Sequence, residues 1–249
     1  MLTGSELAVA LLVVSAGALL SATVSFGFGV VVTPVLLLFL EAKSTVVVVN
    51  CLMGLLLMMV LAQTWRHLNL RASGGLILGG LVATPVGVLA LNSTGPGTLK
   101  IIVAVVIMVL GLLSLVDLKL PLAERRLFGP IFGFATALAV TSISIGGPLA
   151  AVYAIAQKWE PQAVRAPLAL LFLTVNVVAL ALYSTTGLVH RETLTNIGVL
   201  APGLLARFAA AAMVVGRLDV RAFRYLAVAV ILTGGSVLMG REIAVLYTT

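Results

Sequence analysis

Two glycine-rich stretches that lead to a proline hold the residues of this sequence best suited to binding chemistry. They are "SFGFGVVVTP", with Gly27, Gly29, Thr33 and Pro34, and "SISIGGP", with Ser142, Ser144, Gly146, Gly147 and Pro148. Glycine lets a ligand approach the backbone closely, and proline suits the first turn of a helix. A helix that restarts after such a break presents free N–H donors and a positive dipole end, which attract anions. The hydroxyls of these stretches, with that of Thr141, would add donors, whereas close helix packing is the alternative reason for small residues here.

Three further polar residues stand inside apolar runs. Asn50 and Asn176 can each donate and accept hydrogen bonds, so they either line a pathway or bond to the backbone of a neighbouring segment. Arg207 is the only charged residue between positions 193 and 216. An ionisable residue within a membrane helix is costly, and a guanidinium suits contacts to oxyanions. The alternatives for Arg207 are snorkelling to the interface and pairing with a carbonyl.

Other chemistry is not supported by the sequence. Every Asp and Glu lies at an end of an expected helix or in a loop, as do His67 and His190, and Cys51 is the single cysteine. No nucleophile–base–acid set, metal site or phosphate-binding Gly-Lys-Ser/Thr loop can be assembled from these residues. We therefore expect no catalytic residues, no enzyme activity, no metal and no cofactor.

The composition places these residues in a membrane protein. The 249 residues are 61% hydrophobic and 9% charged, whereas soluble domains have about 25% charged residues. Apolar runs long enough to cross a bilayer recur along the chain, which predicts an all-α polytopic membrane protein. Six plain spanning helices are expected, at residues 44–63, 73–91, 99–116, 167–186, 194–214 and 222–239. The net charge of +7 lies in short loops, which favours a role in topology over nucleic-acid binding.

Two longer segments, 7–40 and 127–157, contain the glycine-rich stretches and are predicted to be broken helices. Each is followed by three plain helices, and residues 98–111 align with 222–235. Pro34 then lies over Pro148, and Asn50 over Asn176. This internal repeat predicts two units, an N-terminal repeat at 1–118 and a C-terminal repeat at 119–249, each a hairpin plus three transmembrane helices.

The Lys and Arg residues test whether the second broken segment is a hairpin. If it returns to its starting side, the loop Lys and Arg residues divide 10 to 4 between the two sides, and if it crosses once they divide 7 to 7. Cytoplasmic loops carry an excess of Lys and Arg, so the bias favours a hairpin. With both segments as hairpins, the repeats are inverted, both termini lie outside and the loop at 66–71 is cytoplasmic.

These residues resemble a known family. Two copies of a glycine-rich stretch, "FGFGVVVTP" and "SISIGGP", open four-segment units that close with "LKIIVAVVIMVLGLLSL" and "FRYLAVAVILTGGSVL". The pattern resembles the TauE/SafE sulfite exporter family, also called TSUP, over nearly the whole chain. The resemblance implies transport of small sulfur-containing anions, such as sulfite, thiosulfate or organosulfonates. It carries anion contact over to Gly27, Gly29, Pro34, Ser144, Gly146, Gly147 and Pro148.

We therefore expect a secondary transporter, an exporter in the plasma (cytoplasmic) membrane, that binds its anion at the midplane between two inverted hairpins. An anion channel or facilitator is the alternative, and a membrane scaffold without transport is a third hypothesis. The expected partners are a small anionic substrate and the lipid bilayer, with no nucleic acid. The coupling ion, H⁺ or Na⁺, and the oligomeric state are left open.

Overall fold

The computed structural model describes residues 2, 4–24, 27–68, 70–113, 125–159 and 161–214, and these ranges form helices and no strand. The main helices are α1 (Gly4–Val24), α2 (Phe28–Leu36), α3 (Ala42–Thr64), α4 (Leu70–Ser93), α5 (Pro96–Leu113), α6 (Gly129–Ile143), α7 (Gly147–Ala156), α8 (Pro161–Thr185) and α9 (Arg191–Val214). Two short 3₁₀ helices, η1 (Trp65–His67) and η3 (Arg126–Phe128), lie in connections. The helix predicted at 222–239 lies outside the described residues.

The plain helices expected from the sequence are confirmed as α3, α4, α5, α8 and α9. The start of α8 was predicted too late, because the helix begins at Pro161 and holds Pro167 in its interior. Three described helices are long and apolar enough to cross a membrane: Ala42–Thr64, Ser73–Ser93 and Val164–Thr185. On the outer faces of α4 and α6, Leu78 and Ile131 are 65% and 62% exposed, which suits contact with lipid rather than water.

The second long segment folds as a helical hairpin, as predicted. Helix α6 ends at Ile143 and is followed by Ser144, whose φ of 61° is left-handed, and α7 begins three residues after Ser144 at Gly147. The rings of Phe132, near the start of α6, and Tyr153, near the end of α7, lie 5.4 Å apart. Because the start of one helix packs on the end of the other, the two run antiparallel.

The first long segment is also broken, between α1 and α2. Gly27 precedes α2 with a φ of 95°, a left-handed conformation that glycine adopts at no steric cost. A Cβ at Gly17 in α1 would meet the side chains of Phe28 and Val32 in α2. Residues on both sides of the break therefore face each other, and α2 turns back along α1.

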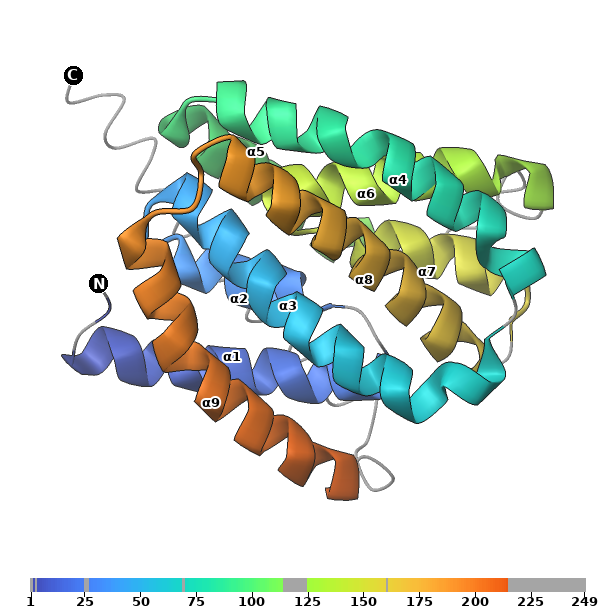
Figure 1. Cartoon of the computed structure of the whole chain (residues 1–249), viewed down its shortest axis with the longest axis horizontal. Coiled ribbons are helices and arrows are strands. Elements are labelled where there is room, and N and C mark those ends of the chain that lie inside the picture. The colour runs from blue at the N-terminus through green and yellow to red at the C-terminus, as the bar shows by residue number, and fades with distance from the viewer. Residues whose placement is uncertain are drawn as a thin grey trace.

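Helices α3 and α8 lie side by side between the two hairpins (Figure 1). They run antiparallel, since Asn50 of α3 bonds to Tyr183 of α8 while Gly54, one turn later in α3, faces Asn176. Helix α6 packs on α4, and α1 packs on α9, so each hairpin lies against a helix from the other half of the chain. This pairing agrees with two inverted repeats, which stay a prediction.

The α4–α6 seam brings the backbones of the two helices into contact. A Cβ at Gly79 in α4 would overlap the carbonyl oxygen of Pro130 in α6, and a Cβ at Gly133 in α6 would overlap that of Leu76. Small residues permit such close approach in membrane helices. The seam therefore fixes the second hairpin against the first half of the chain.

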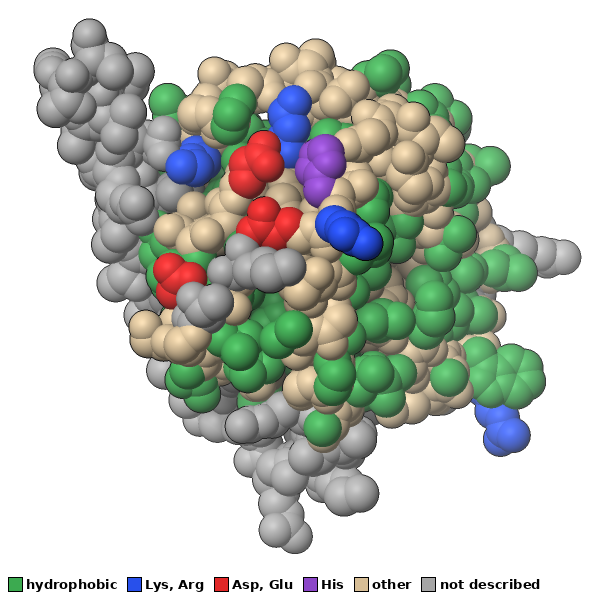
Figure 2. Space-filling view, turned by 60° about the vertical axis from the view of Figure 1, so that its left-hand side comes forward, with side chains coloured by type: hydrophobic (Ala, Val, Ile, Leu, Met, Phe, Trp, Pro, Cys, Tyr) green, Lys and Arg blue, Asp and Glu red, His purple; other side chains and the backbone are tan. Residues whose placement is uncertain are grey.

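Charged side chains gather at the end of the molecule where α3 and α9 begin. Figure 2 shows acidic, basic and histidine side chains together on this face, with hydrophobic side chains on much of the surface around them. A small cavity of about 60 Å³ opens here, lined by Phe39, Leu40, Glu41, Ser44, His190, Glu192 and Thr193. The position suits a membrane–water boundary, where the sequence had placed Glu41, His190 and Glu192 in loops.

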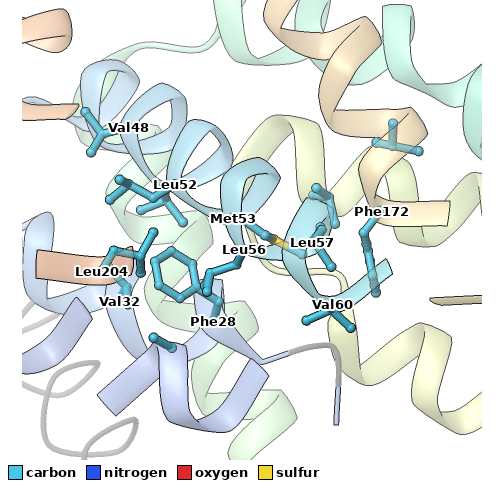
Figure 3. Packing of buried hydrophobic residues seen from close by; sticks show 14 of the residues in the cluster. Phe28, Val32, Val48, Leu52, Met53, Leu56, Leu57, Val60, Phe172 and Leu204 are labelled. Carbon is cyan, nitrogen blue, oxygen red and sulfur yellow. The ribbon is translucent and has the colours of Figure 1, made fainter. Parts of the chain in front are cut away.

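The hydrophobic core holds the start of α2 in place. Phe28 and Val32 of α2 pack with Leu52 and Leu56 of α3 and with Leu204 of α9 (Figure 3). Phe28, Leu52 and Leu204 are fully buried. The first turn of α2 is thus anchored by helices from both halves of the chain.

Candidate functional site

The two helix breaks meet inside the bundle. A Cβ at Gly29, in the first turn of α2, would overlap the carbonyl oxygen of Ser144 at the end of α6. Gly29, Gly146 and Gly147 are buried, and Ser144 is 2% exposed. The two stretches singled out from the sequence, about 115 positions apart in the chain, therefore form one buried contact.

The starts of α2 and α7 both lie at this contact. The first N–H groups of a helix have no partner within the helix. In α2, the first N–H that donates within the helix is that of Val31, to the Gly27 carbonyl at 3.3 Å, so the donors of Phe28, Gly29 and Val30 precede it. In α7, Pro148 has no N–H, and the Leu149 and Ala150 N–H groups donate to the Gly146 carbonyl at 3.2 and 3.4 Å, so Gly147 carries the remaining donor of the first turn. Pro148 lies in the first turn of α7, as predicted.

The prediction for Pro34 was wrong. Helix α2 begins at Phe28, so Pro34 lies in its interior and not in its first turn. The left-handed conformation of Gly27 sets the start of the helix six residues earlier than the proline would have done. Pro34 is buried in α2, away from the free N–H groups of the first turn.

Most of the hydroxyls expected to serve a ligand already have backbone partners. Thr141 Oγ1 donates to the Ala137 carbonyl at 2.8 Å, and Ser142 Oγ to the Leu138 carbonyl at 2.6 Å. Ser144 Oγ donates across the bundle to the Val46 carbonyl of α3 at 3.2 Å. These bonds hold the end of α6 in place and leave the three hydroxyls engaged.

Two buried threonines differ from the others. Thr33 in α2 and Thr136 in α6 are 0% exposed, and neither hydroxyl has a hydrogen-bond partner among the residues described. The Thr136 carbonyl lies against Gly146, where a Cβ would overlap it. Unpaired buried polar groups cost free energy, so each needs an explanation such as a ligand or water. Sequence reasoning found Thr33 and missed Thr136, which stands in an ordinary apolar helix pattern.

The two asparagines make different bonds. Asn50 Nδ2 donates to the Val140 carbonyl of α6 at 3.1 Å and to Tyr183 Oη at 3.0 Å, so it bonds to a hairpin backbone. Asn176 Nδ2 donates to the Phe172 carbonyl of its own helix at 2.7 Å. The Oδ1 atoms of both are buried without a partner in the described part of the chain. The two residues are therefore equivalent in the repeat alignment but not in their contacts.

Tyr183 is a second residue that sequence reasoning missed. Its hydroxyl donates to the Thr141 carbonyl at 2.5 Å and accepts from Asn50, and the side chain is fully buried. A buried tyrosine hydroxyl usually finds a hydrogen-bond partner, so a lone tyrosine in the run at 167–186 was the available signal. Arg207 lies in α9, and its side chain is outside the described residues.

Comparison with known proteins agrees with this architecture. Residues 9–238, nearly the whole chain, match the family described as sulfite exporter TauE/SafE. Neither a curated protein nor a solved structure matches the chain. The family is one of membrane transporters and not of enzymes, and the long apolar helices identify an integral membrane protein. The chain belongs to the TauE/SafE sulfite exporter family.

Proposed function

We propose that this protein is a secondary transporter that exports a small sulfur-containing anion, such as sulfite, thiosulfate or an organosulfonate. The observation that carries the proposal is the buried contact of Gly29 with Ser144, which brings the starts of α2 and α7 together. Two helix N-termini offer free N–H groups and the positive ends of two dipoles to one ligand. The unpaired Thr33 hydroxyl adds a donor on α2.

The arrangement of helices supports a transport cycle. Secondary transporters built from inverted repeats bind substrate near the bilayer midplane, where broken helices expose backbone groups. The antiparallel α3 and α8, which follow the two hairpins, have the relation expected of inverted repeats at 1–118 and 119–249. We place both termini outside, in a multi-pass protein of the plasma membrane.

The tips of the two hairpins, at Gly29 and Ser144, are in contact, which favours alternating access over a fixed filter. Ser144 and Ile145 are 2% and 1% exposed, and the Ser144 carbonyl fills the space beside Gly29. An anion can reach both helix starts only after the tips separate. A channel with a permanent pore would need no such movement.

Flux through purified protein in proteoliposomes tests the function. Wild-type protein is expected to carry sulfite, thiosulfate and sulfoacetate with saturable rates and counterflow, and to leave a neutral solute of similar size inside. Imposed H⁺ and Na⁺ gradients, applied one at a time, identify the coupling ion. Equal flux of the neutral solute, or no anion flux, would contradict the proposal, and unsaturable flux without counterflow would favour a channel.

A further inference from the structure

The second hairpin places two opposite dipole ends at the same break. Helix α7 presents its N-terminus there, whereas α6 ends there and presents its C-terminal carbonyl groups. The C-terminal carbonyls of a helix carry partial negative charge and favour cations. An anion beside Gly146 therefore meets attraction from α7 and repulsion from α6, and a helix break alone does not select its charge.

The carbonyls at the end of α6 are occupied by donors from the loop and from other helices. The Ile145 N–H donates to the Ala139 carbonyl at 3.3 Å and the Ser144 N–H to the Val140 carbonyl at 2.8 Å. Asn50 of α3 supplies a second donor to the Val140 carbonyl at 3.1 Å. Tyr183 of α8 supplies the donor to the Thr141 carbonyl at 2.5 Å.

We propose that Tyr183, supported by Asn50, is a positioning residue that makes the break selective for anions. The Tyr183 hydroxyl holds the Thr141 carbonyl toward α8 and so offsets part of the negative end of α6. The positive end of the α7 dipole and the Gly147 N–H then dominate at the break, because the Leu149 and Ala150 N–H groups already donate to the Gly146 carbonyl. This role rests on the proposed function, because it assumes that an anion binds between the tips. Asn50 links to both Tyr183 and α6, so the three helices α3, α6 and α8 share one bond network.

The network belongs to one hairpin in the described structure. Asn176, which aligns with Asn50 in the repeat, bonds to Phe172 within α8. The position that aligns with Tyr183 falls near Leu57, which has no hydroxyl. The two hairpins therefore contribute differently, with the charge selection assigned to the tip of α6 and α7.

The test is a Tyr183→Phe variant, which removes one hydroxyl and keeps the ring. Loss of one neutral hydrogen bond is expected to raise the KM for thiosulfate export about fivefold, with little change in the maximal rate. The rise should be larger for divalent thiosulfate than for monovalent methanesulfonate, because the freed carbonyl acts through charge. A merely structural role would not depend on substrate charge.

The matched control is Tyr153→Phe, the same chemical change at the far end of the same hairpin, which should leave both KM values at the wild-type level. Asn50→Leu provides a second variant, expected to raise the same KM values in the same order, if Tyr183→Phe does not fold. Unchanged KM values in Tyr183→Phe, or equal changes for both anions, would overturn the role of Tyr183. A wild-type protein without saturable anion flux would overturn the proposed function itself, which is a distinguishable result.

Discussion

A Gly29→Ala substitution tests the contact on which the proposed site depends. The new Cβ would overlap the Ser144 carbonyl oxygen, a backbone atom that cannot rotate aside as a flexible side chain would. Overpacking of this kind costs about 1–3 kcal/mol. For a chain of 249 residues, this predicts a fall in Tm of roughly 2–12 °C. Applied to the closed arrangement of the tips, the same free energy shifts the balance toward separation by about 5- to 150-fold.

The assay pairs Gly29→Ala with Gly198→Ala, a helical glycine of α9 whose added Cβ meets nothing within 4 Å. Glycine to alanine in an unhindered helix stabilises by about 0.5–1 kcal/mol, so the control should raise Tm slightly and keep wild-type flux. Gly29→Ala should lower Tm and, because it favours separated tips, raise the non-saturable part of the anion flux in the same proteoliposomes. If both variants raise Tm and transport normally, the tips do not touch and the reasoning fails.

Three further substitutions follow from single contacts. Thr33→Val removes an unpaired buried hydroxyl, so the Tm of the anion-free protein should hold or rise while the Tm increase caused by added thiosulfate shrinks. Ser144→Ala and Ser144→Gly both lose the bond to Val46, but alanine must keep a left-handed backbone that glycine adopts freely. Ser144→Ala should therefore be less stable than Ser144→Gly by about 1 kcal/mol in urea unfolding. Gly79→Ala should lower Tm, because its Cβ overlaps the Pro130 carbonyl of the α4–α6 seam; a raised Tm would refute that seam.

The helices and the position of each break could be predicted from the sequence, whereas the bonding at the breaks could not. Gly-Gly-Pro after two serines predicts a helix break, but the left-handed position falls on Ser144 and not on a glycine. For Asn50 the sequence left two interpretations open, lining a pathway or bonding to the backbone of a neighbouring segment. The hydrogen bond that decides between them goes to the Val140 carbonyl, 90 positions away in the chain. Tyr183 was missed for the same reason, since the carbonyl it serves lies 42 positions earlier in α6. Local propensity identifies elements, and contacts between distant elements decide the role of each polar side chain.

The closed contact of the tips has a consequence for how export is controlled. A ligand shifts an equilibrium only by its differential affinity for the two states. Because the Ser144 carbonyl occupies the space beside Gly29, the closed arrangement excludes an anion from the contact, and only separated tips expose both helix starts. Under the proposed function, the anion would stabilise the separated state and an empty protein would return to the closed one. Substrate binding would then open the contact between the hairpin tips, which would couple opening to the presence of cargo and limit leak through the empty transporter.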